Sequence, residues 1–91
     1  MSLASVNPSI HPAIEVGQQF EACPRKVHSP EGIEWDYPHG KGIVTVEAVT
    51  EAGESTEFGT RSEEAVWYRF EDSDKVQDLE PHYFLLSFSR I

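Results

Sequence analysis

The chain has 91 residues, of which 38% are hydrophobic and 25% are charged. This length suits one small domain with a modest core, and no apolar run approaches the roughly 20 residues of a membrane-spanning helix. Sixteen acidic residues against seven basic ones give a formal net charge of −9. Nucleic acid and anionic membranes are bound through clusters of Lys and Arg, so the charge argues against either as a direct partner.

Residues 1–13 contain no Asp, Glu, Lys or Arg and include Pro8 and Pro12. They indicate an extended N-terminal arm, which either frays or lies on a neighbouring subunit. The same residues show neither the basic start nor the apolar block of a signal peptide. Cys23 is the only cysteine, so no intrachain disulfide can form, and we expect a cytoplasmic protein.

Apolar residues alternate with polar ones over residues 14 to 22, which predicts a first strand. Residues 24 to 42 are rich in Pro and Gly and predict a long loop, of the kind that is usually functional or disordered. Residues 42 to 50, with many β-branched side chains, predict the strongest strand.

The second half of the chain continues this pattern. Residues 51 to 64 are polar with two glycines and predict a long hairpin connection, and residues 65 to 71 predict the strand that pairs back. A turn follows, with room for one helical turn near residues 75 to 80. Residues 83 to 89 predict the final strand, because no helical repeat is sustained there.

Both faces of the predicted strands carry apolar residues, which a closed, strongly bent sheet accommodates best. The layout "VGQQF", long loop, "GKGIVTVEAV", hairpin, "VWYRFED", short turn, "LEPHYFLLSF" resembles an SH3-like small barrel. It is similar, more narrowly, to small uncharacterised barrel proteins of bacterial and phage genomes. The resemblance implies a mostly-β fold of four to five antiparallel strands, with residues 14–91 as a single domain. Such barrels bind peptides, bind nucleic acid or act as scaffolds, so the fold does not decide the function.

The run "AVWYRFE" places four large apolar side chains within five residues. With Val66, Tyr68 and Phe70 inside, Trp67 and Arg69 point outward. If strands 42 to 50 and 65 to 71 pair, their outer faces bring together four side chains, namely Trp67, Arg69, Glu47 and Val49. This group is either an ordinary surface cluster with an Arg69–Glu47 contact or the anchor of an interface, and we expect another protein chain to cover Trp67.

Two further aromatic residues, Trp35 and Tyr37, lie in the predicted loop of residues 24 to 42. They form either a plug that folds back onto the open end of the barrel or a surface that binds peptides. The candidate interface residues are therefore Trp67, Arg69, Glu47, Val49, Trp35 and Tyr37.

The sequence predicts no metal site and no cofactor. The four histidines and Cys23 lack the ligand spacing of a zinc site. The segment "DSDKVQD" resembles the start of a calcium loop, but Val76, Gln77 and Tyr83 stand where a ligand, the turn glycine and the closing glutamate are needed.

The sequence also predicts no enzyme. Two basic residues, Arg25 and Lys26, lie close to Cys23 in the sequence, yet one small cysteine at a strand end is more often a core filler. No phosphate-binding glycine loop and no nucleophile motif is present.

We therefore expect a non-catalytic protein-interaction or accessory module of a bacterium or phage, with a protein partner, basic for preference, or self-association. The alternative is an acidic nucleic-acid mimic that inhibits a DNA-binding protein. Mimicry needs a continuous stripe of carboxylates, for which the candidates are Glu47, Glu51, Glu54, Glu57, Glu63, Glu64, Glu71, Asp72 and Asp74.

Overall fold

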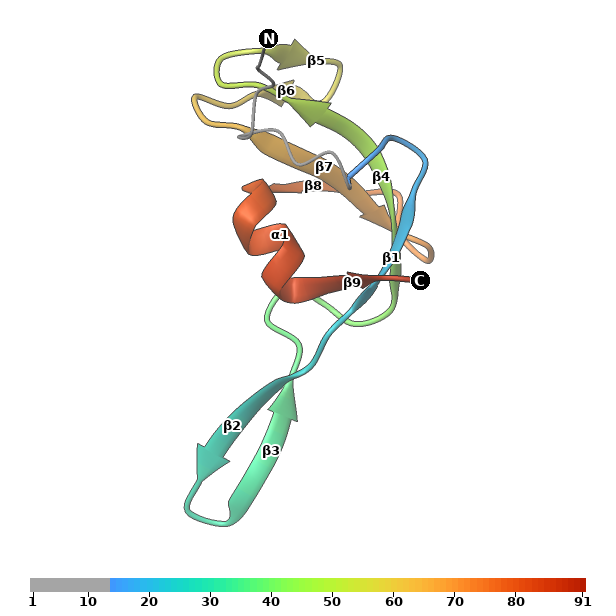
Figure 1. The fold of residues 1–91 in the computed structure, drawn as a ribbon. Helices are drawn as coiled ribbons and strands as arrows, with labels where there is room; N and C mark the ends of the chain where they lie inside the picture. Colours follow the sequence, from blue (N-terminus) through green and yellow to red (C-terminus); the bar gives the residue numbers. More distant parts are fainter. Residues whose placement is uncertain (1–13) are drawn as a thin grey trace, which may run out of the picture.

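The computed structural model describes residues 14–91 and is mostly β, with one short helix (Figure 1). The arm predicted at residues 1–13 lies outside the described residues. The elements in chain order are β1 (Gln19–Ala22), β2 (Arg25–Ser29), β3 (Gly32–Asp36), β4 (Ile43–Thr50), β5 (Ser55–Thr56), β6 (Gly59–Thr60), β7 (Ala65–Phe70), β8 (Val76–Leu79), α1 (Pro81–Ser87) and β9 (Phe88–Arg90).

Five of these strands form one antiparallel sheet in the order β8–β7–β4–β1–β9. β4 and β7 pair along their length, with a register shift between Val46 and Ala48. The shift leaves Glu47 without a residue opposite it, which is the arrangement of a β-bulge. The last strand pairs with the first, so β9 and β1 are neighbours in the sheet.

The core lies on the inner face of this sheet and is largely aromatic. The ring of Tyr68 has its centroid 5.4 Å from that of Phe84 and 5.2 Å from that of Phe88. Phe84 also meets Phe20 edge to face, at 4.9 Å. All four rings are buried, and burial of one such side chain contributes about 1.5–3 kcal/mol. The cluster therefore holds β1, β7, α1 and β9 together.

The inner-face assignment of β7 is confirmed, because Val66, Tyr68 and Phe70 all belong to the buried cluster. The first strand is shorter than predicted. Residues 14 to 18 lie outside β1, with Ile14 buried in the core but Val16 exposed.

The strand predicted over residues 83 to 89 is wrong, because α1 occupies most of that segment and only β9 is extended. Pro81 stands at the start of α1, where its fixed φ fits and its missing N–H is not needed. The residues that α1 and its C-terminal end bury are Pro81, Phe84 and Phe88, which are three and four positions apart and so share one face. Figure 1 shows α1 in front of the sheet.

The helical turn predicted near residues 75 to 80 is also wrong. β8 occupies that segment and pairs antiparallel with β7, with Val76 opposite Arg69 and Leu79 opposite Val66. The sheet therefore gains a strand where a turn was expected, and the helix follows it.

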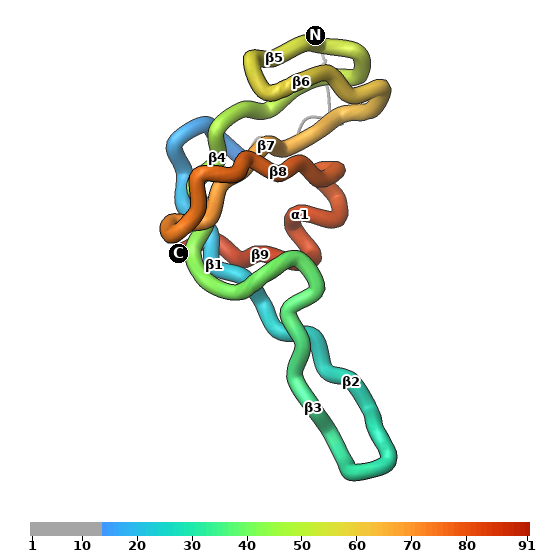
Figure 2. Tube along the Cα trace, turned by 180° about the vertical axis from the view of Figure 1, so that it is seen from behind, coloured from blue at the N-terminus to red at the C-terminus, as the bar shows by residue number. Residues whose placement is uncertain are grey.

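The long loop predicted over residues 24 to 42 contains a regular hairpin, in which all five residues of β2 pair with all five of β3. The hairpin extends away from the rest of the molecule in both views (Figures 1 and 2). It accounts for the elongated shape of the molecule, which measures 53 × 31 × 25 Å.

Candidate functional site

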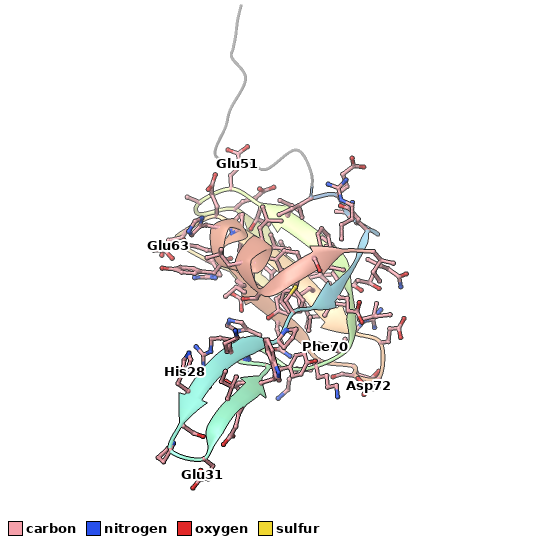
Figure 3. All side chains as sticks on the ribbon, turned by 60° about the horizontal axis from the view of Figure 1, so that its bottom comes forward. His28, Glu31, Glu51, Glu63, Phe70 and Asp72 are labelled. Carbon is pink, nitrogen blue, oxygen red and sulfur yellow. The ribbon has the colours of Figure 1, made fainter. Side chains whose placement is uncertain are left out.

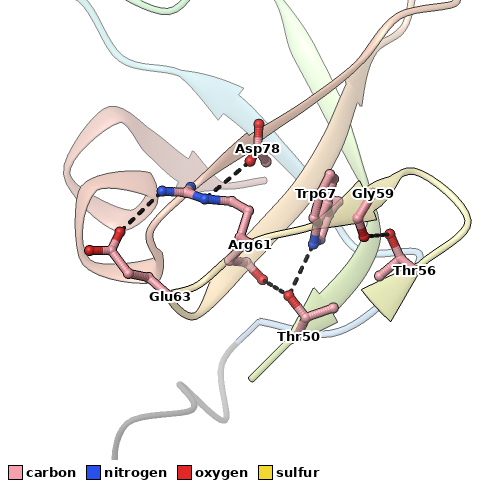
Figure 4. A network of polar contacts seen from close by, with 8 residues as sticks. Thr50, Thr56, Gly59, Arg61, Glu63, Trp67 and Asp78 are labelled. Atoms are coloured by element: carbon pink, nitrogen blue, oxygen red, sulfur yellow. Dashed lines mark hydrogen bonds and ion pairs between the residues drawn. The ribbon is translucent and has the colours of Figure 1, made fainter. Parts of the chain in front are cut away.

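Trp67 is covered by the chain's own β5–β6 hairpin, and its exposed fraction is 5%. The ring of Phe58 lies 6.2 Å from the indole between centroids, and Gly59 is so close that an added Cβ would lie 3.5 Å from the indole. The indole Nε1 donates a hydrogen bond of 3.0 Å to the hydroxyl of Thr50 (Figure 4). The expectation that another protein chain covers Trp67 is therefore wrong.

Arg61, in the connection between the β5–β6 hairpin and β7, forms two ion pairs. Its guanidinium lies 3.2 Å from the Glu63 carboxylate and 3.3 Å from the Asp78 carboxylate of β8 (Figure 4). The hydroxyls of Ser55 and Thr60 lie 2.8 Å apart across the hairpin. Segment 51 to 64 is thus a structured cap and not an open loop.

Two of the other candidates predicted for the outer face of the main sheet, Arg69 and Glu47, pair with each other. The guanidinium of Arg69 lies 3.1 Å from the carboxylate of Glu47, which confirms the predicted contact. The prediction that Val49 faces outward is wrong, because the register shift after Val46 places Val49 opposite the inward-facing Val66, and it packs half-buried against the core. With Trp67 capped, the described structure leaves no exposed aromatic anchor at this place.

Trp35 and Tyr37 have different surroundings in the structure. Tyr37 is half-buried against the core, with the Lys41 ammonium 5.5 Å from its ring centroid, as the plug interpretation requires. Trp35 lies on β3 with 61% of its surface exposed, so the plug interpretation is wrong for this residue.

The hairpin presents Trp35 on one of its two faces. Residues directly opposite in an antiparallel pair share a face, and the register places Lys26 opposite Trp35 and His28 opposite Ile33. The Lys26 ammonium lies 5.8 Å from the Trp35 ring centroid, and Ile33 is 55% exposed. This face therefore combines two exposed apolar side chains with two basic ones.

A cleft of about 380 Å³ lies at the base of the hairpin, next to α1. Its walls include Pro24 and Pro38 from the hairpin base and the exposed Tyr83 and Leu86 from α1. The remaining lining residues are Cys23, Arg25, His39 and Ser87. We call the hairpin face and this cleft the hairpin–helix surface, defined by Lys26, His28, Ile33, Trp35, Pro24, Pro38, Tyr83, Leu86, Arg25 and His39.

Arg25 at the cleft is held in place by a hydrogen-bonded ion pair of 2.9 Å with Asp36 across the hairpin. The thiol of Cys23 lies 3.2 Å from the Ser89 hydroxyl and 3.9 Å from the Glu21 carbonyl oxygen, so its polar contacts are made away from His39. The geometry thus offers an apolar cleft with the Arg25 guanidinium at its edge and no hydrogen bond between Cys23 and His39.

The group with a marked pKa shift lies in the core and not at this surface. Burial raises the pKa of Tyr68 to about 12, and the negative charge of Asp78 adds to the shift. Within residues 14–91, no three His, Cys, Asp or Glu side chains are arranged to hold a metal ion. In the same part of the chain, no helix has the length and apolar character needed to cross a bilayer.

Sequence reasoning missed Phe58, the cleft, and the role of Tyr83 and Leu86. Phe58 is the one large apolar residue in the polar segment 51 to 64, and that isolation was a usable signal that the segment packs onto something. Tyr83 and Leu86 were assigned to a strand, which hid their place on the exposed face of a helix.

Comparisons with known proteins add no family to this picture. No protein-family model matches the chain, and neither a curated protein nor a solved structure matches it. The function must therefore be argued from the geometry of the chain.

Proposed function

We propose that the chain is a non-catalytic protein-interaction module, built on an SH3-like barrel, that binds through the hairpin–helix surface. The barrel is supported by the order of the sheet, in which the last strand returns to pair with the first. It is also supported by the position of α1 directly before that strand.

The observation that carries the proposal is where the exposed apolar side chains gather. Ile33 and Trp35 lie on the hairpin, and Tyr83 and Leu86 lie at the cleft, each at least half exposed. Aromatic side chains of this kind are enriched at the centres of protein interfaces. An isolated two-stranded hairpin is marginally stable in water, so a second surface packed on β2 and β3 would also stabilise them.

Charge separates this surface from the rest of the molecule. Residues 23 to 42 contain three basic and three acidic side chains, so the formal charge of −9 is carried by the remainder of the chain. A partner that is itself acidic can therefore approach the hairpin with less repulsion than it meets elsewhere on the molecule. The surface itself does not select a basic partner by charge.

The distribution of the carboxylates favours this proposal over the acidic mimic. Figure 3 shows Glu51 and Glu63 at one end of the main sheet and Asp72 at the other. Between them, Glu47 is partly buried and paired with Arg69. A phosphate-like stripe needs continuity, and this pairing interrupts it.

Photo-crosslinking tests the proposal. A benzophenone amino acid is placed at position 35 in one variant and at position 54, in the acidic segment 51 to 64, in another. In the cells that produce the protein, we expect a covalent adduct to a protein from position 35 and none from position 54. Adducts from position 54 alone, or from neither position, would contradict the proposed binding surface.

A further inference from the structure

We infer that the occupant of the hairpin–helix surface is a second copy of this chain. In this dimer, two β2–β3 hairpins pack antiparallel on their Trp35 faces, and each tip points toward the cleft of the other copy. The inference rests on the proposed function, because it takes the same surface and names its partner.

The first argument is that the molecule carries both halves of such a contact. The hairpin projects as an arm whose Ile33 and Trp35 side chains are exposed, and the cleft at its base is walled by Tyr83 and Leu86. A two-fold axis brings the same patch of two copies together, so arm and cleft are satisfied twice in one closed contact. A strand of five residues spans about 17 Å, which separates tip and base enough for an antiparallel arrangement.

The second argument is charge complementarity along the hairpin. Its tip carries the carboxylate of Glu31, whereas the base of its Trp35 face carries the Lys26 ammonium. Antiparallel packing places the acidic tip of one copy beside the basic base of the other. Two chains that each have a net charge of −9 can meet in this way without bringing their acidic sheets together.

The third argument is area. The exposed parts of Ile33, Trp35, Tyr83 and Leu86 together amount to something on the order of 500 Å² per copy. The polar side chains and backbone that flank them bring the contact toward the roughly 800 Å² per partner of a standard interface. An interface of this size and polarity fits a reversible dimer.

Sedimentation velocity on the purified full-length chain tests the inference. We expect a reversible monomer–dimer equilibrium with a dissociation constant on the order of 10 μM, as suits a small interface. Trp35→Ala and Ile33→Lys should each raise that constant at least about tenfold. Val16→Lys is the matched control, because Val16 is 66% exposed and lies outside the surface, and it should leave the constant unchanged.

A charge exchange gives a second, independent readout. Glu31→Arg opposes two basic groups in a homodimer, and Lys26→Glu opposes two acidic ones, so each variant alone should be monomeric at concentrations where the native chain dimerises. When the two variants are mixed, both tip-to-base contacts become attractive again, and we expect heterodimers. Circular dichroism of each variant checks that the fold is kept.

Three results would overturn the inference: a chain that stays monomeric up to about 500 μM, far above a typical weak dissociation constant; a dimer that survives both Trp35→Ala and Ile33→Lys; or mixed charge variants that do not associate. If the chain is monomeric but still crosslinks to a different protein from position 35, the homodimer is wrong and the proposed function still holds.

Discussion

The indole of Trp67 donates its hydrogen bond to Thr50, a residue of the neighbouring strand, beneath a hairpin that belongs to the same chain. A side chain on the outer face of a sheet is normally available to a partner. Here β5 and β6 fold over it, so the tryptophan stabilises the fold and a different tryptophan, Trp35, remains exposed.

Trp67→Ala should therefore destabilise the fold by about 3–5 kcal/mol, because it empties the space beneath the β5–β6 hairpin. Trp67→Phe should cost about 1–2 kcal/mol, since it keeps a ring against Phe58 but removes the donor to Thr50. Urea unfolding followed by circular dichroism measures both. A Trp67→Ala chain with the native midpoint would restore the idea of an exposed anchor.

Tyr68→Ala should also cost about 3–5 kcal/mol, although its side chain points to the opposite face, because it removes the ring that contacts Phe84 and Phe88. Two adjacent residues of β7 are then both structural, each in a cluster of its own. The same unfolding experiment tests this, and a loss below about 1 kcal/mol would show that the aromatic cluster is looser than described.

Alkaline pH should weaken the fold through Tyr68. Its pKa is about 12 in the folded chain, against an ordinary value of 10.0 in the unfolded chain. Below pH 10 both states keep the proton, and between pH 10 and 12 only the unfolded state loses it. Stability should therefore fall across that window, by up to about 2–3 kcal/mol. Tyr68→Phe should flatten this part of the profile, and an unchanged profile would assign the loss to another group.

Gly40→Ala should destabilise the chain more than Gly17→Ala. Both glycines have a positive φ, of 108° and 88°, but a Cβ on Gly40 would lie 2.7 Å from the ring of Phe70, whereas a Cβ on Gly17 meets open space. The backbone strain is about 1–2 kcal/mol in each case, and the collision adds about 1–3 kcal/mol at Gly40 alone. Thermal melts of the two variants compare them directly. Equal shifts would mean that the Phe70 ring moves aside freely.

The Arg69–Glu47 pair should contribute little. Its side chains are 45% and 22% exposed, and a double-mutant cycle should give a coupling free energy of about 0.2–1 kcal/mol that shrinks as salt is added. A coupling above about 2 kcal/mol would show that the bulge at Glu47 depends on the pair.

Much of the main sheet could be predicted from the sequence. Strands β4 and β7 each bury one face, and this burial produces an alternation of apolar residues. The alternation identified Tyr68 as inward and Trp67 as outward, which is confirmed. It carried no information on what covers the outer face. That depends on Phe58, a residue from a polar segment whose packing is set by a tertiary contact.

The C-terminal helix was missed for a different reason. The run from Tyr83 to Leu86 is apolar at every position, and a short apolar run does not distinguish a helix from a buried strand by its period. Pro81 before the run was the better signal, since it favours the first turn of a helix.

The β2–β3 hairpin has the weakest hydrophobic pattern in the sequence. None of its strand residues is fully buried, so no face had to be apolar and no alternation marks it. The candidate surface was only partly predicted as a result: Trp35 was named, whereas Ile33 and the cleft were not.

The most direct test of the central claim is acrylamide quenching of tryptophan fluorescence in two single-tryptophan chains, at concentrations below those at which the hairpins associate. Trp67→Phe leaves Trp35 as the only emitter, and Trp35→Phe leaves Trp67. We predict that Trp35 emits at longer wavelength and is quenched several-fold more strongly, while Trp67 is shielded. Equal quenching, or a shielded Trp35 with an accessible Trp67, would contradict the assignment of Trp67 to the fold and of Trp35 to the binding surface.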